Sequence, residues 1–227
     1  MPSPTVENYL KRIYTEQQRR DGGLVPMGTL AVRMSVTPGT ATSMVKTLAE
    51  ARLLDYVPRD GVRLTPEGTR LALDVLRRHR LIELFLVQVL KLDWSEVHDE
   101  AEELEHALSE KVLARIDEVL GHPDTDPHGD PIPSANGAPR HRVLKSLMEC
   151  ETSSQVWIAQ VADEDPDFLQ FVERHGLKPG TAIHIERRDP SADAVTLVPR
   201  NGQAVTMGSA AAAKILVGET PTHQAQE

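Results

Sequence analysis

Apolar residues in the first fifty positions recur every three to four residues, which is the spacing of one helical face. The pattern predicts helices over residues 5–20, 29–34 and 40–51. Asp21-Gly22-Gly23 ends the first helix, and residues 35–39 make a tight turn between the other two. A short helix, a tight turn and a second helix of this length predict a helix-turn-helix.

A basic hairpin is predicted directly after the third helix. Residues 53–57 and 62–64 have the composition of short strands, and the Asp60-Gly61 pair between them is a strong hairpin signal. A hairpin in this place is a wing, from which Arg59 and Arg63 can reach DNA phosphates.

The third helix carries short polar side chains at its start and on its outer face. Hydroxyl groups and glycine allow close approach to base edges and phosphates, although Ser and Thr in such places also cap helices. We expect the DNA contacts of this helix to come from Thr37, Gly39, Thr40, Thr42, Ser43 and Lys46.

Two longer helices are predicted after the wing, over residues 66–90 and 95–120. Thr65-Pro66-Glu67 gives the first of them an N-cap, a proline in the first helical position and an acid in the first turn. Its second half is apolar on most sides, as a buried dimer interface would require.

Six imidazole and carboxylate groups lie on helical faces where apolar residues would normally pack against a core. They occur at helical spacing in the two long helices: His79, Glu83, His98, Glu102, Glu105 and His106. Antiparallel packing of the helices would bring them together. Buried charges are stable when paired or bound to a cation, so a divalent metal is the simplest partner. The alternative is that these faces are solvated and carry ordinary ion pairs.

The proline-rich segment 122–133 also contains metal-binding residue types. His122, Asp124, Asp126 and His128 lie among its prolines. Prolines that punctuate a loop in this way are typical of turns, so we expect a structural role for these four residues.

From residue 153 the apolar period changes to two. The pattern predicts a helix over 167–175 and five strands, at 155–161, 181–186, 194–198, 204–207 and 214–217. Short strands at this density predict a small β-barrel. The expected fold is mainly α with a small β part. Its expected divisions are a winged helix-turn-helix at 1–70, a helical dimerisation and metal domain at 71–138, a linker at 139–152, the barrel at 153–218 and a disordered tail at 219–227.

Composition narrows the class of protein. The formal net charge is −9, yet residues 1–75 carry 10 Lys/Arg against 8 Asp/Glu, while the remainder carries 15 against 26. DNA binding therefore depends on a local basic surface and not on the global field. A single cysteine, Cys150, excludes an internal disulfide and fits a reducing cytosol. Without a signal core or a long apolar run, a cytoplasmic protein with no membrane partner is expected.

Three motifs together resemble a known family. They are His79-xxx-Glu83, His98-Asp-Glu-Ala-Glu102-xx-Glu105-His106 and Pro127-His-Gly-Asp-Pro-Ile-Pro133, all after a winged helix. The arrangement resembles the diphtheria toxin repressor family of metal-dependent transcriptional regulators, over essentially the whole chain. The resemblance implies that the C-terminal barrel is an SH3-like domain, and that the protein binds operator DNA as a homodimer without an organic ligand.

The resemblance also implies two metal sites. One would use His79, Glu83 and His98, with an acid from the barrel, for which we choose Glu164 among 163–165. The other would use Glu102, Glu105 and His106 with a residue of the first helix. That residue is Asn8 here, whereas relatives have Met or Asp, so the site has one charge fewer than an Asp would give.

The ligand types favour manganese. Iron-responsive members of the family have Cys where this chain has Glu102, and carboxylate and amide oxygens suit hard Mn²⁺ better than a soft thiolate does. Fe²⁺ is a second candidate effector, and Cd²⁺, Co²⁺ or Zn²⁺ are expected to bind in vitro. The resemblance implies repression of metal-uptake genes when the ion is abundant.

Two other classes of protein stay open on sequence grounds. A metal-dependent hydrolase also uses His/Glu clusters, but nothing marks a nucleophile or a substrate cleft, so we expect no enzyme. A winged-helix regulator that senses an organic ligand is the other class, with the charged face as ordinary ion pairs.

Overall fold

The structure, a computed structural model, describes residues 2–135, 143–163 and 165–218. Its internal contacts divide the chain into two units. The first contains the residues up to His79, together with Glu105–Ala107 and the described residues from Pro133. The second contains Arg80–Leu104, Leu108–Ile132 and the C-terminal sheet.

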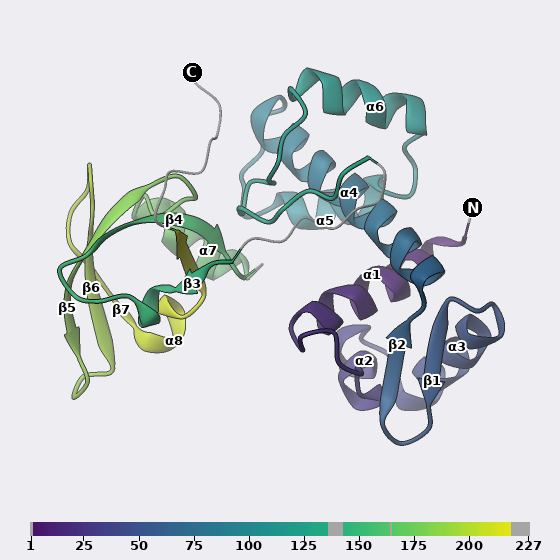
Figure 1. Ribbon diagram of the computed structural model, residues 1–227. Coiled ribbons are helices and arrows are strands. Elements are labelled where there is room, and N and C mark those ends of the chain that lie inside the picture. Colours follow the sequence, from purple (N-terminus) through teal and green to yellow (C-terminus); the bar gives the residue numbers. More distant parts are fainter. Residues whose placement is uncertain (1, 136–142, 164, 219–227) are drawn as a thin grey trace. The chain divides into compact units, whose positions relative to one another are not determined.

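The first unit confirms the predicted helix-turn-helix and hairpin (Figure 1). Ser3 caps the first helix and Thr37 caps the third, each through a side-chain oxygen. The apolar faces of the helices pack into one core around Leu10, Ile13 and Leu48. Its elements are α1 Pro4–Gln18, α2 Met27–Arg33, α3 Pro38–Glu50, β1 Leu54–Val57, β2 Gly61–Leu64 and the first half of α4 Pro66–Gln88.

The wing is attached to the helices through a backbone bridge between Val25 and Val62. Gly61 makes this possible, because its φ is +146° and a Cβ added to it would lie 2.4 Å from the Val25 carbonyl oxygen. Gly68 allows a similar close approach at the start of α4, because a Cβ added to it would lie 1.9 Å from the Leu53 carbonyl oxygen. Close backbone contacts therefore occur at the start of β2 and just before β1.

The predicted single helix over 95–120 is wrong. The second unit contains two helices there, α5 Val97–Leu104 and α6 Glu110–Val119. Ser109 begins α6 by accepting a hydrogen bond from the Val112 amide, and this cap offers the chain a new start in place of a continuous helix. Glu105 and His106 consequently lie in the turn after α5 and not on its face.

The segment 122–133 is a structured loop. The Asp126 carboxylate accepts hydrogen bonds from the amides of His128 and Asp130, both at 2.9 Å. Arg80 of α4 donates to the Pro131 carbonyl at 2.5 Å and to Asp130 at 2.9 Å. These contacts give the Asp126 carboxylate a structural role in the loop, while the structural role of His122, Asp124 and His128 stays a prediction.

The C-terminal part of the second unit is a six-stranded antiparallel sheet in the order β3-β8-β4-β5-β6-β7. The five predicted strands are present, and β3 adds a sixth from within the predicted linker 139–152, which is a correction. The elements are β3 Lys145–Ser146, η1 Leu147–Glu149, β4 Gln155–Val161, α7 Pro166–Arg174, β5 Ala182–Asp189, β6 Ala194–Pro199, β7 Val205–Gly208, α8 Ser209–Ala212 and β8 Ile215–Gly218. The predicted tail at 219–227 lies outside the described residues.

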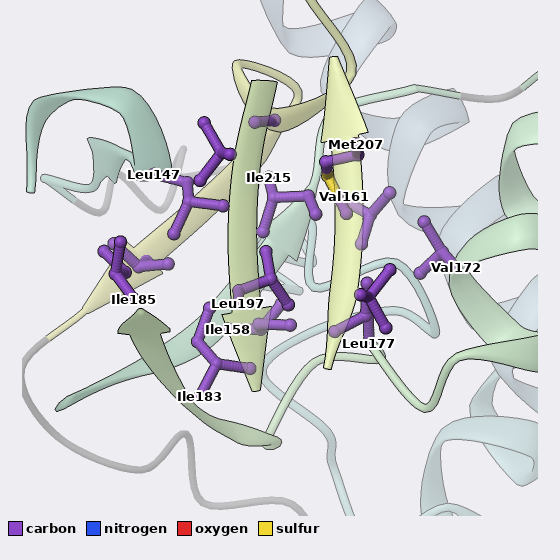
Figure 2. Close-up of a cluster of buried hydrophobic side chains, with 14 of the residues drawn as sticks. Leu147, Ile158, Val161, Val172, Leu177, Ile183, Ile185, Leu197, Met207 and Ile215 are labelled. Atoms are coloured by element: carbon purple, nitrogen blue, oxygen red, sulfur yellow. The ribbon is translucent and has the colours of Figure 1, made fainter. Parts of the chain in front are cut away.

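The core of this sheet is aliphatic, and Figure 2 shows Ile158, Ile183, Leu197 and Ile215 converging in it. Trp94, from the segment between α4 and α5, belongs to the same buried cluster. The loop 122–133 also contacts the sheet, since the Val161 amide donates to the His128 carbonyl at 2.8 Å. Among the described residues, none of the helices is both long and apolar enough to cross a membrane.

Candidate metal centre

His106 lies between two residues of α1. Its Nδ1 is 2.6 Å from Glu7 Oε2, and its Nε2 is 2.7 Å from Asn8 Oδ1. The same Nε2 lies 3.4 Å from Glu105 Oε1. One imidazole therefore faces three oxygen atoms from two segments that are about a hundred residues apart in the sequence.

Glu105 forms the buried centre of this group. Lys11 of α1 donates to both of its carboxylate oxygens, at 2.7 and 2.9 Å. Nδ1 of His79 lies 2.7 Å from Glu105 Oε2 and 3.4 Å from the Lys11 ammonium. Glu105 is fully buried, and Lys11 and His79 are 7% and 5% exposed, so water contributes little to these contacts.

A second carboxylate, Glu7, is 4% exposed. Arg78 of α4 lies 3.5 Å from its Oε1 and donates to the backbone carbonyl of Glu105 at 3.4 Å. The two buried carboxylates beside His106, Glu7 and Glu105, are thus matched by two cationic side chains, Arg78 and Lys11.

The geometry around Asn8, Glu105 and His106 fits a hard divalent cation. Neighbouring ligand atoms in an octahedral shell with bonds of about 2.1 Å lie roughly 3 Å apart. The distances from His106 Nε2 to the Asn8 and Glu105 oxygens are 2.7 and 3.4 Å. Glu7 would hold the other ring nitrogen, which is the role that carboxylates play behind metal-binding histidines.

In the second unit, Glu83 of α4 meets His98 of α5. Glu83 Oε1 is 3.3 Å from His98 Nδ1, and His98 Nε2 is 3.8 Å from Glu102 Oε1. Glu83 is buried, whereas the two α5 residues are partly exposed. The i, i+4 spacing of His98 and Glu102 predicted this contact, and the structure brings Glu83 to it.

The other oxygen of Glu83 faces the loop. It lies 4.0 Å from His128 Nδ1, and Glu83, Asp126 and His128 have ligand-type atoms within 4.8 Å of one another. Arg80 balances part of this charge, with its Nε 3.5 Å from Asp126. Burial, followed by the charges of Asp130 and Glu83, raises the pKa of Asp126 well above its usual value.

Sequence reasoning missed Glu7 and Lys11. Both lie within one turn of Asn8 on α1, and both are charged residues that are buried next to the apolar Tyr9 and Leu10. That mismatch was the available signal. The proposed barrel ligand Glu164 lies outside the described residues.

The predicted DNA-contacting residues lie at the surface of the first unit. Thr37, Gly39, Thr40, Ser43, Lys46, Arg59 and Arg63 are exposed, and Thr42 is partly exposed. Some hydroxyls also serve the helix itself, because Thr37 caps α3 and Thr42 donates to the Pro38 carbonyl at 2.8 Å. Arg63 pairs only loosely with Asp55, at 3.7 Å.

Three family models match successive parts of the chain. Residues 1–62 match the N-terminal DNA-binding domain of iron-dependent repressors, and residues 65–134 match their metal-binding and dimerisation domain. Residues 145–219 match the FeoA domain. Together the three models account for nearly the whole sequence.

Known relatives agree with these matches. The chain is 29% identical over 208 residues to the iron-dependent repressor IdeR of Mycobacterium leprae, covering 86% of this chain and 89% of that protein. It is 34% identical over 128 residues to the transcriptional regulator MntR of Listeria monocytogenes, covering 55% of this chain and 88% of that protein.

Among solved structures, the chain is similar to a manganese-dependent transcriptional repressor in complex with manganese. The TM-score is 0.85 at 38% sequence identity, over 95% of this chain and 100% of that one. The fold, the arrangement of ligand-type residues and these similarities all indicate the same family. The chain belongs to the iron-dependent repressor family, the metal-dependent DNA-binding repressors that include the diphtheria toxin repressor.

Proposed function

We propose that this chain is a manganese-responsive repressor of metal-uptake genes, acting as a homodimer on operator DNA in the cytoplasm. One observation carries the proposal: His106, from the turn after α5, meets Glu7 and Asn8 of α1. Because α1 belongs to the DNA-binding domain, the occupancy of a site at His106 is linked to the position of that domain.

Two cation sites are proposed. The first uses Asn8, Glu102, Glu105 and His106, with Glu7 orienting the His106 ring. The second uses His79, Glu83 and His98, with Glu164 as a further ligand. Support for the second site comes from the contact between Glu83 and His98, and from the position of His79 one helical turn before Glu83 on α4.

A bound cation supplies positive charge and a fixed ligand geometry. In its absence Glu7 and Glu105 rely on Arg78 and Lys11 for charge balance. The residues of α1 can then separate from the turn at 105–107, and the recognition helix α3 loses its fixed pose. With the ligands held together, the two α3 helices of a dimer would be set at the spacing of successive major grooves, roughly 34 Å.

Oxygen donors favour manganese in this proposal. Asn8, Glu102 and Glu105 offer amide and carboxylate oxygens. Hard cations such as Mn²⁺ prefer these oxygen ligands to soft sulfur ligands. Fe²⁺ is the second candidate effector, which the similarity to IdeR favours. Raw affinity rises from Mn²⁺ through Fe²⁺ and Co²⁺, so Cd²⁺, Co²⁺ and Zn²⁺ are expected to bind in vitro.

The DNA contacts proposed are those of α3 and the wing. Thr37, Gly39, Thr40, Thr42, Ser43 and Lys46 would meet the major groove, while Arg59 and Arg63 would contact phosphates. The domain boundaries at 70, 138, 152 and 218 are part of the same proposal.

The experiment is a DNA-binding titration with duplexes selected from a random pool in the presence of Mn²⁺. Affinity is measured with chelator, Mn²⁺, Fe²⁺ and Zn²⁺ at one fixed salt concentration. We expect stimulation by Mn²⁺, and its loss in Glu102→Ala with the dimer intact. Equal operator affinity with and without Mn²⁺ would refute the proposal.

A further inference from the structure

Lys11 occupies the side of Glu105 that a metal ion would need. The ammonium contacts both carboxylate oxygens, at 2.7 and 2.9 Å, and lies 3.4 Å from His79 Nδ1. We propose that Lys11 is a built-in competitor of the metal ion, and that a divalent cation binding Glu105 must displace its ammonium. The inference rests on the proposed function, because it concerns the same site.

Crowding is the first reason. The second oxygen of Glu105 already has His79 Nδ1 at 2.7 Å, and the first has His106 Nε2 at 3.4 Å. Glu105 is fully buried and the Lys11 ammonium contacts both of its carboxylate oxygens, so an ion that bonds to this carboxylate meets the ammonium on it. A cation bonded to Oε1 would lie within a few ångströms of the ammonium, in surroundings where like charges repel strongly.

Charge balance is the second reason. Lys11 and Arg78 already match Glu105 and Glu7. With Glu102, which the proposed site also uses, the group has three carboxylates against the charges of Lys11 and Arg78. A divalent ion added to it would leave one surplus positive charge, whereas exchange for the Lys11 ammonium leaves none. The ammonium keeps its proton as it leaves, and its flexible four-carbon stem allows it to move toward solvent.

This exchange sets the metal concentration at which the protein responds. Displacing Lys11 costs free energy that is subtracted from the free energy of metal binding. The observed metal affinity is therefore lower than the affinity of the ligands without Lys11. Lys11 therefore raises the metal concentration that the protein needs for a response. Cations that bind carboxylates weakly would not displace it.

The test measures Mn²⁺ dissociation constants of chelator-stripped full-length protein by competition with a fluorescent chelator. Lys11→Leu removes the charge and keeps an apolar stem, and Lys11→Arg keeps the charge. Lys111→Leu on α6 is the matched control, since Lys111 is exposed. A neighbouring charge at this distance shifts a binding equilibrium by about ten- to a thousand-fold. We expect Lys11→Leu to bind Mn²⁺ at least about tenfold more tightly than wild type, and the other two variants not to gain affinity.

A second measurement uses the wild-type protein and does not depend on the stability of a variant. An amine-acylating reagent followed by mass spectrometry reports the accessibility of each lysine. Lys11 should be protected without metal and become reactive when Mn²⁺ saturates the protein, while Lys111 should react equally in both states.

The outcomes separate the two proposals. If wild type and Lys11→Leu bind Mn²⁺ equally, or if Lys11 stays protected in the Mn²⁺-saturated protein, the competitor role is overturned and the metal site stands. If neither protein binds Mn²⁺, the proposed function fails, and this inference fails with it.

Discussion

Oε2 of Glu7 lies 2.6 Å from Nδ1 of His106, across 99 positions of sequence. A carboxylate in this position favours the tautomer of His106 that has its proton on Nδ1. The unprotonated Nε2 then faces Asn8 and Glu105. Replacement of Glu7 by Ala should therefore weaken Mn²⁺ binding by about 10- to 100-fold, the usual effect of losing such a partner. Glu7→Gln should lose less, because its amide oxygen still accepts. Competition titration measures both, with the exposed Glu50→Ala as control. An unchanged affinity in Glu7→Ala would contradict an orienting role.

Asn8 gives the first site an uncharged oxygen. Asn8→Asp keeps the size of the side chain and adds a negative charge next to His106, so Mn²⁺ should bind about tenfold more tightly, a gain of roughly 1.4 kcal/mol. Asn8→Leu removes the oxygen and should weaken binding. Isothermal titration of the two variants measures the difference, and the same affinity for both would show that Asn8 is not a ligand.

Gly68 allows the start of α4 to pass close to β1. Gly68→Ala would place a methyl group 1.9 Å from the Leu53 carbonyl oxygen, so backbone must shift, and we expect a loss of about 2 kcal/mol or more in the free energy of unfolding. Gly28→Ala on α2 has nothing within 4 Å and should be neutral or stabilising. Urea denaturation compares the two. Equal stability of both variants would mean that the close contact at Leu53 is absent.

Lys46 is exposed on α3. If it contacts a phosphate, Lys46→Ala should weaken binding to all duplexes about equally and reduce the slope of log affinity against log salt by about 1. Fluorescence anisotropy at several salt concentrations measures this, with Lys111→Ala as control. A loss confined to one DNA sequence would instead place Lys46 on a base edge.

Asp126 provides a prediction about pH. Burial raises the pKa of its carboxyl group in the folded protein, so the native state holds the proton longer than the unfolded chain does. Its contribution to stability is therefore complete below the unfolded pKa of about 4, and it is lost as the pH rises through the folded pKa. Asp126→Asn stays neutral and keeps an acceptor for the His128 and Asp130 amides. The free energy of unfolding of Asp126→Asn, relative to wild type in chelator, should rise from pH 4 toward neutrality. A constant difference would contradict the raised pKa.

Local patterns were sufficient to predict much of the fold. The periodicity around Leu10 and Val45 predicted α1 and α3, and Asp60-Gly61 predicted the wing, because these signals lie within one element. The break before Ser109 was missed, since no Gly or Pro marks it and the Glu-rich stretch keeps a helical period. Strand β3 was missed because two residues, Lys145 and Ser146, become a strand only by pairing with β8, some seventy positions later.

The candidate site was predictable only in part, for a similar reason. The spacing of His98 and Glu102, and of His79 and Glu83, is a local property and could be seen in the sequence. Glu7 and Lys11 acquire their meaning from His106 and Glu105, which lie more than ninety positions away. Periodicity carries no information about which distant helix brings a carboxylate or an ammonium to a buried partner.

Trp94 comes from the segment before α5, yet it is buried among the aliphatic residues of the C-terminal sheet, with the Lys178 ammonium 5.2 Å from its ring. A buried indole fluoresces at short wavelength, and exposure of the Trp94 ring to water would shift its fluorescence to longer wavelength. The sheet and the segment before α5 thus share one natural optical reporter. A form of the protein cut off before residue 143 would expose an aromatic ring that the full chain keeps dry, and its solubility would suffer accordingly.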